Sequence, residues 1–476
     1  MALENKECIK NETKSLKEKL FSKKKIVWDE IDKDEKERIM SFAEGYKSFL
    51  DNGKTEREAA LEIIKFAKGK GFQTISDNPS GNKIFYLHCN KCVAMAVLGK
   101  RPIEEGLRII VSHIDSPRLD LKQNPIYEDV NLSLLKTHYY GGIKKYHWVN
   151  RPLALHGKII KRDGSEIELR LGEDSDDPVF IVSDLLIHLW RKTQATKKAE
   201  EAVEGENLNI IASSIPYAKD KEFDQRFKLA LLELLFHKYG ITEDDFMSAE
   251  LEAVPAEKAR DLGWDRSMIC AYGHDDRACA YPALRAIGDL EETENTTLCL
   301  FMDKEEIGSE GNTGTDSCFI EYIVGDLLRL KGIQNESSLR LTLAHSECIS
   351  ADVNSAIEPD WQNLFDKRNA AKIGGGICLT KYGGSGGKSG SNDANAEFVA
   401  KIRRILDEKN VIWQTGEIGK VDEGGGGTVA KFMAWYGMDV MDAGVPVLGM
   451  HSPCEIISKA DLYMTYKAYK AFLESF

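Results

Sequence analysis

The fold can be read from one stretch of the sequence, Leu107-Arg108-Ile109-Ile110-Val111-Ser112-His113-Ile114-Asp115-Ser116-Pro117. The run from residue 107 to 112 is short and rich in β-branched side chains, which is typical of a buried strand. Pro117 has no backbone N–H for a sheet ladder, so the strand ends before it. His113 and Asp115 are therefore expected at the end of a strand, where open α/β sheets place their sites.

Further strands and helices are expected along the chain. Runs at 297–302, 339–345 and 446–450 predict strands, and each leads into a loop with acids or a histidine. Helical patterns alternate with them at 53–71, 225–239 and 458–476, and Thr55 and Glu58 are spaced as a capping box. This alternation predicts an α/β fold in which four polar loops converge beyond the strand ends.

The stretch from about residue 119 to 209 differs from the rest in its hydrophobic pattern. Short alternating runs at 158–161 and 167–171 flank Asp163-Gly164, which is typical of a β-hairpin. We therefore expect a β-rich unit here. A second hairpin is expected at 85–95, with Cys89 and Cys92 at its turn, because no matching pair of ligands follows that would complete a zinc knuckle.

Bulk properties narrow the class of protein. The chain has 476 residues, 42% hydrophobic and 30% charged, which is ordinary globular composition with room for two or three domains. A net charge of −13 disfavours nucleic acid and anionic membrane surfaces as partners. No apolar run is long enough to span a bilayer, and the polar N-terminus lacks the core of a secretion signal. The ten cysteines are therefore expected to be reduced and the protein cytoplasmic.

Acidic pairs are common in this sequence, so position distinguishes the informative ones. Asp275-Asp276 precedes a helix expected near Ala280, and Glu305-Glu306 follows the strand at 297–302. In extended backbone, neighbouring carboxylates point in opposite directions, so one can bind a metal while the other addresses the bound water. A metal pair needs a bridging carboxylate and several terminal ligands. The candidate ligands are His113, Asp275, Glu306, Asp352 and His451.

Other motifs carry weaker indications. Six further histidines are expected to be structural: His88, His138, His147, His156, His237 and His345. Ser385 has the letters of a nucleophile elbow, but four glycines around it favour a flexible loop. Tyr382 stands where a phosphate-binding loop needs its first glycine.

Five motifs together resemble the aspartyl aminopeptidases, a family of dinuclear metallopeptidases that assemble into tetrahedral particles. The motifs are Ser112-His113-Ile114-Asp115-Ser116-Pro117, His274-Asp275-Asp276-Arg277, Asp303-Lys304-Glu305-Glu306-Ile307-Gly308, Ser350-Ala351-Asp352-Val353 and Gly449-Met450-His451-Ser452. They occur in the family's order, and the similarity covers nearly the whole chain. Ser355 and Glu358 stand where many members show histidines, so a bacterial branch of the family is the closer match.

The resemblance implies a division of labour among the candidate residues. Asp275 would bridge two divalent ions, His113 and Asp352 would complete one shell, and Glu306 and His451 the other. Glu305 would be the general base, and Asp115 would orient an imidazole or modulate the metals. Zinc is expected, although such ligands also accept cobalt and manganese.

The resemblance also implies the architecture and the assembly. Residues 1–117 and 250–476 would form a mixed-sheet α/β/α metallopeptidase catalytic domain, and residues 118–249 an inserted β-rich dimerisation domain. Dimers would assemble into a tetrahedral dodecamer, with His188 reaching a neighbouring subunit's active site. Lys381 would supply a basic group for acidic substrate side chains.

The function expected from these residues is removal of the N-terminal residue from peptides with a free amino terminus, with acidic residues as the candidate preference. A metal-bridged water would attack and Glu305 would take its proton. The alternative is another two-metal amidohydrolase, such as a carboxypeptidase or deacylase, which would accept substrates with blocked N-termini. A non-catalytic assembly protein stabilised by metal is more remote, because it has no need of Glu305.

Overall fold

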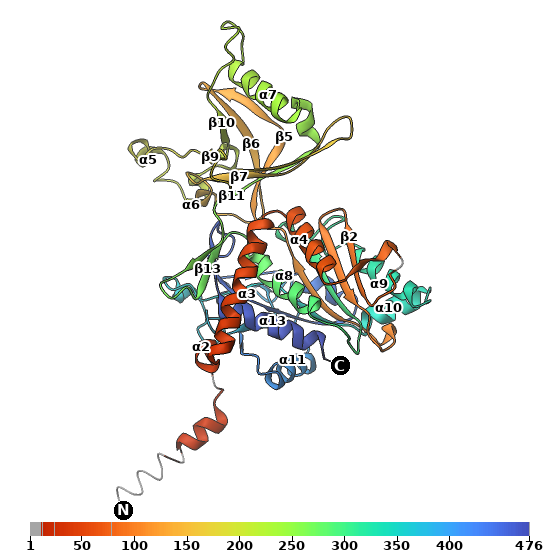
Figure 1. Cartoon of the computed structure of the whole chain (residues 1–476). Helices are drawn as coiled ribbons and strands as arrows, with labels where there is room; N and C mark the ends of the chain where they lie inside the picture. The colour runs from red at the N-terminus through yellow and green to blue at the C-terminus, as the bar shows by residue number, and fades with distance from the viewer. Residues whose placement is uncertain (1–10, 12, 23, 78, 476) are drawn as a thin grey trace, which may run out of the picture.

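The molecule has two parts, one above the other in Figure 1. The computed structural model describes residues 11, 13–22, 24–77 and 79–475, so the first ten residues of the N-terminal stretch used to exclude a secretion signal lie outside the described residues. The lower part is a mixed sheet between helices, as expected for an α/β/α fold, and the upper part is an antiparallel sheet. Within the described residues, no helix combines the length and apolarity that crossing a membrane requires.

A nine-stranded mixed sheet forms the centre of the lower part. In spatial order its strands are β1 (Gln73–Thr74), β2 (Lys83–His88), β3 (Cys92–Val97), β14 (Thr297–Met302), β4 (Arg108–His113), β15 (Glu347–Ser350), β21 (Asp439–Gly444), β17 (Ile377–Thr380) and β19 (Trp413–Thr415). Strand β4 runs parallel to β14 and β15, and β15 runs parallel to β21. The carboxyl ends of these strands therefore meet at one edge of the sheet.

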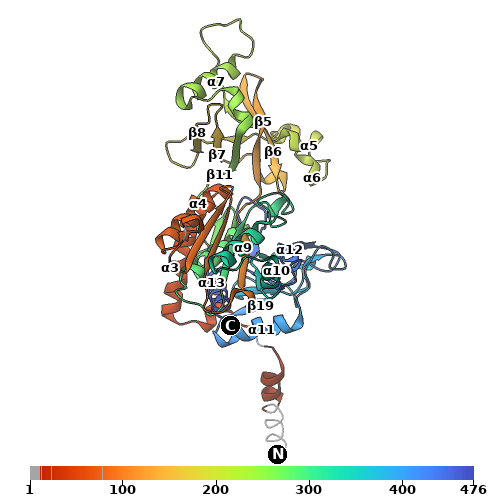
Figure 2. The ribbon, with the colours of Figure 1, turned by 90° about the vertical axis from the view of Figure 1, so that its right-hand side faces the viewer.

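Alternation along the strands divides the core into two layers. Ile110 of β4 and Phe301 of β14 pack in one cluster, and their neighbours Val111 and Leu300 pack in the other. The first cluster is covered by α3 (Lys33–Asn52), α4 (Glu56–Gly69), α8 (His274–Gly288), α11 (Ala396–Glu408) and α13 (Lys459–Leu473). The second is covered by α9 (Phe319–Leu330), α10 (Glu336–Ala344) and α12 (Ala430–Ala434), and Figure 2 shows the two layers of helices from the side.

Two predicted helices have the local features that the sequence indicated. Helix α4 begins after Thr55, whose hydroxyl accepts from the N–H of Glu58 while the Glu58 carboxylate accepts from the N–H of Thr55. The C-terminal helix α13 is capped by Ser458, whose hydroxyl accepts from the N–H of Ala460. The hairpin at 85–95 is also confirmed, as β2 and β3.

The prediction of a strand at 339–345 was wrong, because those residues belong to α10 and the turn that follows it. Asn335 caps this helix by accepting from the N–H of Ser338. The leucines at alternate positions fit a strand pattern, but Leu343 is buried while Leu341 is 50% exposed. The strand of the sheet is β15, which starts at Glu347.

The upper part is a seven-stranded antiparallel sheet. In spatial order its strands are β8 (Glu166–Leu171), β7 (Leu153–Ile160), β11 (Ala249–Pro255), β5 (Arg118–Asp129), β6 (Leu132–Tyr140), β10 (Ile210–Ser213) and β9 (Ile181–Val182). Helices α5 (Ile187–Thr193), α6 (Ala199–Ala202) and α7 (Arg226–Tyr239) accompany it. The hairpin expected around Asp163-Gly164 is β7 with β8. Domain boundaries at 117/118 and 249/250 stay a prediction, and β11 continues past the second of them.

A small five-stranded sheet lies beside the main one and corrects one expectation. Its strands are β12 (Arg260–Leu262), β13 (Met268–Ala271), β23 (Glu455–Ser458), β22 (Pro446–Leu448) and β16 (Asn354–Ser355). Pairing of β13 with β23 brings Cys270 and Cys454 together, and they form a disulfide. The prediction that all cysteines are reduced was therefore wrong for this pair. Residues 184 positions apart give no sign in the sequence that they are neighbours.

Candidate metal centre

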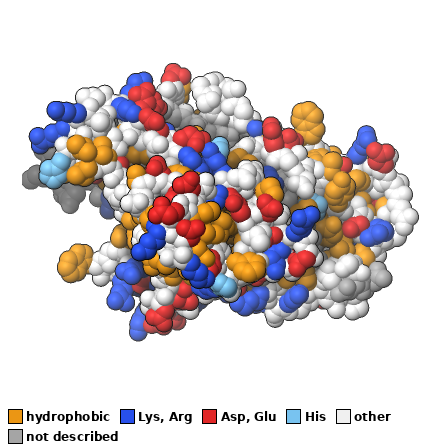
Figure 3. Space-filling model, turned by 90° about the horizontal axis from the view of Figure 1, so that it is seen from above, with side chains coloured by type: hydrophobic (Ala, Val, Ile, Leu, Met, Phe, Trp, Pro, Cys, Tyr) orange, Lys and Arg blue, Asp and Glu red, His pale blue; other side chains and the backbone are white. Residues whose placement is uncertain are grey.

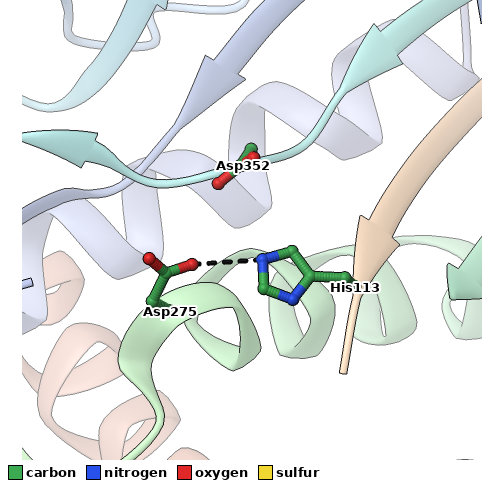
Figure 4. Close-up of side chains that lie close together, drawn as sticks. All are labelled: His113, Asp275 and Asp352. Carbon is green, nitrogen blue, oxygen red and sulfur yellow. Dashed lines mark hydrogen bonds and ion pairs between the residues drawn. The ribbon is translucent and has the colours of Figure 1, made fainter. Parts of the chain in front are cut away.

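The five candidate ligands come from five separate segments and meet beyond the strand ends. His113 ends β4, Asp275 lies in the first turn of α8, and Asp352 follows β15. Glu306 lies in the 3₁₀ turn after β14, and His451 follows β22. They form two groups of three: His113 with Asp275 and Asp352 (Figure 4), and Asp275 with Glu306 and His451. Within each group, the potential ligand atoms all lie within 4.8 Å of one another.

Asp275 belongs to both groups. Its Oδ1 lies 3.1 Å from Nε2 of His113, and its Oδ2 lies 3.2 Å from Nε2 of His451. Oε2 of Glu306 lies 3.3 Å from the same nitrogen of His451. The two oxygens of one carboxylate thus face two different groups of ligands, which is the arrangement of a carboxylate that bridges two cations.

Each imidazole is held through its other nitrogen. Nδ1 of His113 lies 3.1 Å from the carbonyl oxygen of Asp115, and Nδ1 of His451 lies 2.8 Å from that of Gly142. A carbonyl oxygen only accepts, so both Nδ1 atoms carry the proton and donate it. Both Nε2 atoms therefore face the shared carboxylate. While protonated, each Nε2 donates to Asp275, and on losing that proton it offers the lone pair that metal coordination requires.

The charges of this cluster call for a cation. Burial raises the pKa of Asp352 and of Glu306 well above the ordinary value, and the neighbouring Asp275 carboxylate adds to the rise. Burial also opposes ionisation of Asp275, but hydrogen bonds from His113 and His451 hold its pKa below the ordinary value. Within the described part of the chain, the buried Oε1 of Glu306 has no hydrogen-bond partner. Histidine nitrogens and unpaired buried carboxylates are a donor set that fits zinc.

Asp115 organises the turn that carries the two glutamates. Its Oδ1 accepts from the N–H of Glu305 and its Oδ2 from the N–H of Glu306, both at 3.2 Å. These glutamates therefore lie in a 3₁₀ turn, and the expectation that they occupy extended backbone was wrong. Their side chains still separate, because Glu306 joins the His451 group while Oε2 of Glu305 lies 3.9 Å from Nε2 of His113.

Glu305 belongs to neither group of ligands but lies beside them. Burial raises the pKa of its carboxyl to about 7; the charge of His113 opposes this rise and that of Asp275 adds to it. An acid next to a metal centre with a pKa near neutrality can take up and release a proton at working pH.

Two predicted substrate residues are not brought to this cluster by a single subunit. His188 lies on α5 of the upper sheet and is exposed. Lys381 follows β17, which is antiparallel to β21, so it leaves the sheet toward the edge opposite the ligands. Its ammonium is paired with Asp393.

One buried acid beside the ligands was missed by sequence reasoning. Oε1 of Glu455 accepts from the N–H of His451 at 2.7 Å, and its Oε2 accepts from the N–H of Asp275 at 3.1 Å. The carboxyl group of Glu455 thereby holds the backbones of two candidate ligands, His451 and Asp275, beside each other. Burial raises the pKa of Glu455 to about 8. The one feature of the sequence that could have pointed to Glu455 is its position four residues after His451.

Comparison with known proteins decides the family. A family model described as aminopeptidase I zinc metalloprotease (M18) matches residues 49–473. The chain belongs to the M18 family. It is 49% identical over 463 residues to the "Probable M18 family aminopeptidase 1" of Clostridium acetobutylicum, covering 96% of this chain and 99% of that one.

Solved structures of M18 proteins share the fold. The crystal structure of an M18 aminopeptidase from Thermotoga maritima superposes with a TM-score of 0.92 at 44% identity, covering 96% of this chain and all of that one (100%). The structure of aminopeptidase I from Clostridium acetobutylicum gives a TM-score of 0.90, also at 44% identity, with coverage of 96% and 100%. As an M18 member, the protein is a zinc metalloaminopeptidase, a hydrolase, which sets aside the reading as a non-catalytic assembly protein.

Proposed function

We propose that this M18 enzyme removes N-terminal residues with two divalent cations held side by side, one in each group of ligands. The observation that carries the proposal is Asp275, whose two carboxylate oxygens face His113 on one side and His451 on the other. His113 and Asp352 would complete one shell, and Glu306 and His451 the other. Zinc suits this mixture of imidazole and carboxylate, and cobalt or manganese would also be accepted.

Glu305 would serve as the general base of the reaction. When bound, the cations lower the pKa of a water molecule and polarise the carbonyl of the scissile bond. Glu305 accepts the proton that this water loses, and it passes the proton to the leaving amine. Asp115 fixes the position of the base, because its carboxylate accepts from the N–H of Glu305.

The upper sheet would join subunits. Figure 3 looks down on it and shows hydrophobic side chains in several patches. Exposed apolar residues of this part include Val179, Ile187, Leu189, Ile215, Leu234 and Phe236. A cavity of about 930 Å³ lies between α7 and the sheet, with Leu121, Leu155, Leu231 and Leu235 in its lining. Apolar surface of this extent supports pairing with a second copy.

The proposed pairing gives His188 a role. This histidine lies among Leu186, Ile187 and Leu189, which are 53%, 61% and 57% exposed. We propose that these apolar side chains dock on a neighbouring subunit and bring His188 to its metal centre. Assembly of dimers into a dodecamer would follow the yeast relative solved as the "mApe1 dodecamer", which shares the fold at 19% identity and a TM-score of 0.72.

The substrate class and the compartment complete the proposal. Peptides with a free amino terminus are the expected substrates, with Asp and Glu as candidate preferred N-terminal residues. The position of Lys381 beside Asp393 gives this preference no support within one subunit. We propose a cytoplasmic location. The exposed free thiols of Cys89 and Cys318 favour it, whereas the disulfide between Cys270 and Cys454 argues against it.

The test is a matched pair of peptide panels on zinc-loaded enzyme. Each panel varies the first residue among Asp, Glu, Leu and Lys, and the two panels differ by acetylation of the N-terminus. We expect cleavage after the first residue of the free peptides and none of the acetylated ones. Cleavage of acetylated peptides at a comparable rate would instead identify a deacylase or another amidohydrolase.

A further inference from the structure

The strand β6 of the upper sheet ends at the metal centre of the lower part. Its last residue is Tyr140, whose hydroxyl donates to Oδ2 of Asp115 at 2.8 Å. This hydrogen bond joins the two parts of the molecule at the acid that carries the turn of Glu305 and Glu306. Tyr140 is thus separated from two functional side chains by one carboxylate.

The two residues after Tyr140 contact the opposite side of the same centre. The carbonyl oxygen of Gly142 accepts from Nδ1 of His451. Gly141 has φ of +75°, and a Cβ there would lie 3.3 Å from Cβ of Glu306, so the backbone passes close to this ligand. Tyr140 and Gly142 therefore contact Asp115 and His451, and Gly141 between them passes close to Glu306.

The ring of Tyr140 is held in place by a buried arginine. Arg118 is the residue paired with Tyr140 across β5 and β6, and its guanidinium carbon lies 4.0 Å from the centre of the ring. This guanidinium is itself held by three acids, at 3.1 Å from Glu56, 2.8 Å from Asp120 and 3.2 Å from Glu252. The phenol hydroxyl is therefore presented to Asp115 from a rigid support.

The carboxylate of Asp115 has donors on several sides. The N–H groups of Glu305 and Glu306 and the Nδ1 of His113 come from the lower part of the molecule. The Tyr140 hydroxyl comes from the upper part and shares Oδ2 with the N–H of Glu306. Without the hydroxyl, this oxygen loses its shortest hydrogen bond, and the orientation of the carboxylate is less well defined.

We propose that Tyr140 is a positioning residue of the metal centre, which it acts on through Asp115, so that the inserted sheet forms part of the catalytic apparatus. This inference rests on the proposed two-metal function. Residues that hydrogen-bond a metal ligand, as Asp115 bonds His113, typically change metal affinity or activity about 10- to 100-fold when altered, so the loss of the hydroxyl that holds Asp115 should act at the lower end of that range. The hydroxyl of Tyr140 bonds Asp115 and not the substrate. Removal of this hydroxyl should therefore lower zinc affinity and kcat with little change in KM.

The test compares Tyr140→Phe with Tyr139→Phe. The phenylalanine at 140 keeps the ring on Arg118 and removes only the hydroxyl, while Tyr139 is the neighbouring tyrosine, 42% exposed. Zinc affinity is measured by competition with a chromophoric chelator, and kcat and KM on a free peptide. We expect Tyr140→Phe to lose about tenfold in affinity for at least one zinc and about tenfold in kcat, and Tyr139→Phe to match wild type.

A double-mutant cycle separates this role from a merely structural one. If Tyr140 acts through Asp115, then Tyr140→Phe has no further effect on zinc affinity once Asp115→Asn is present. Additive losses in the double variant would overturn the inference, as would a Tyr140→Phe protein with wild-type zinc affinity and kcat. If either result is found while the wild-type enzyme binds zinc and cleaves free peptides, only the role of Tyr140 is refuted and the proposed function stands. A wild-type enzyme that binds no zinc would refute both the role of Tyr140 and the proposed function.

Discussion

Substituting Glu305 with glutamine removes the proposed base and leaves the ligands in place. The amide keeps the size of the side chain, and the N–H of residue 305 can still donate to Asp115. Oε2 of Glu305 lies 3.9 Å from Nε2 of His113, and the residue belongs to neither ligand group, so zinc should be retained. General base catalysis contributes about 10²- to 10⁴-fold, so kcat should fall by that factor, or about 2.7–5.4 kcal/mol in activation free energy.

The assay measures zinc per chain by elemental analysis and kcat and KM on the same samples. Glu310→Gln is the matched control, because this exposed glutamate lies in the same loop and makes the same change of charge. A Glu305→Gln enzyme with full zinc and kcat within about threefold of wild type would refute the assignment of the base, which should supply at least about 10²-fold. Loss of zinc together with activity would identify Glu305 as a ligand instead.

Three further predictions test the cluster, the scaffold and the assembly. Metal-free protein should lose thermal stability as pH rises from about 5 to 10, because two groups bind protons more tightly when the protein is folded than when it is unfolded. Asp275 and Glu306 raise the pKa of His451 to about 10 against the effect of burial, and burial raises the pKa of Glu455 to about 8. Thermal unfolding in chelator with no such fall would contradict this. Thr55→Ala should cost about 1 kcal/mol in denaturant unfolding, since α4 loses its cap. His188→Ala should lose activity and regain part of it on reassembly with Glu305→Gln subunits, whose own His188 would complete its sites; no regain would exclude a shared site.

That the five candidate ligands lie close together could be predicted, because each is marked by the sequence of its own segment. His113, Asp352 and His451 each follow a strand of the molecule, and sites of α/β sheets form where strands end. Each position could be recognised within a few residues of sequence. The shared role of Asp275 followed from the family resemblance, and its two oxygens now lie between the two groups as that role requires.

Contacts between distant segments could not be predicted in the same way. Glu455 accepts directly from the N–H groups of Asp275 and His451, and Tyr140 donates to Asp115. Pairing in two other sheets brings these residues close, and neither lies in a recognisable motif. The same holds for the disulfide between Cys270 and Cys454. The error at 339–345 is of another kind, since leucines at alternate positions suit both strand and helix, and the cap at Asn335 decides between them.

The most direct test of the central claim is zinc per chain, counted on wild type and three ligand variants under identical dialysis. We expect two ions for wild type, one each for His113→Ala and His451→Ala, and none for Asp275→Ala, whose carboxylate would hold both. A wild-type count of one, or an Asp275→Ala protein that retains as much zinc as either histidine variant, would contradict the shared metal centre.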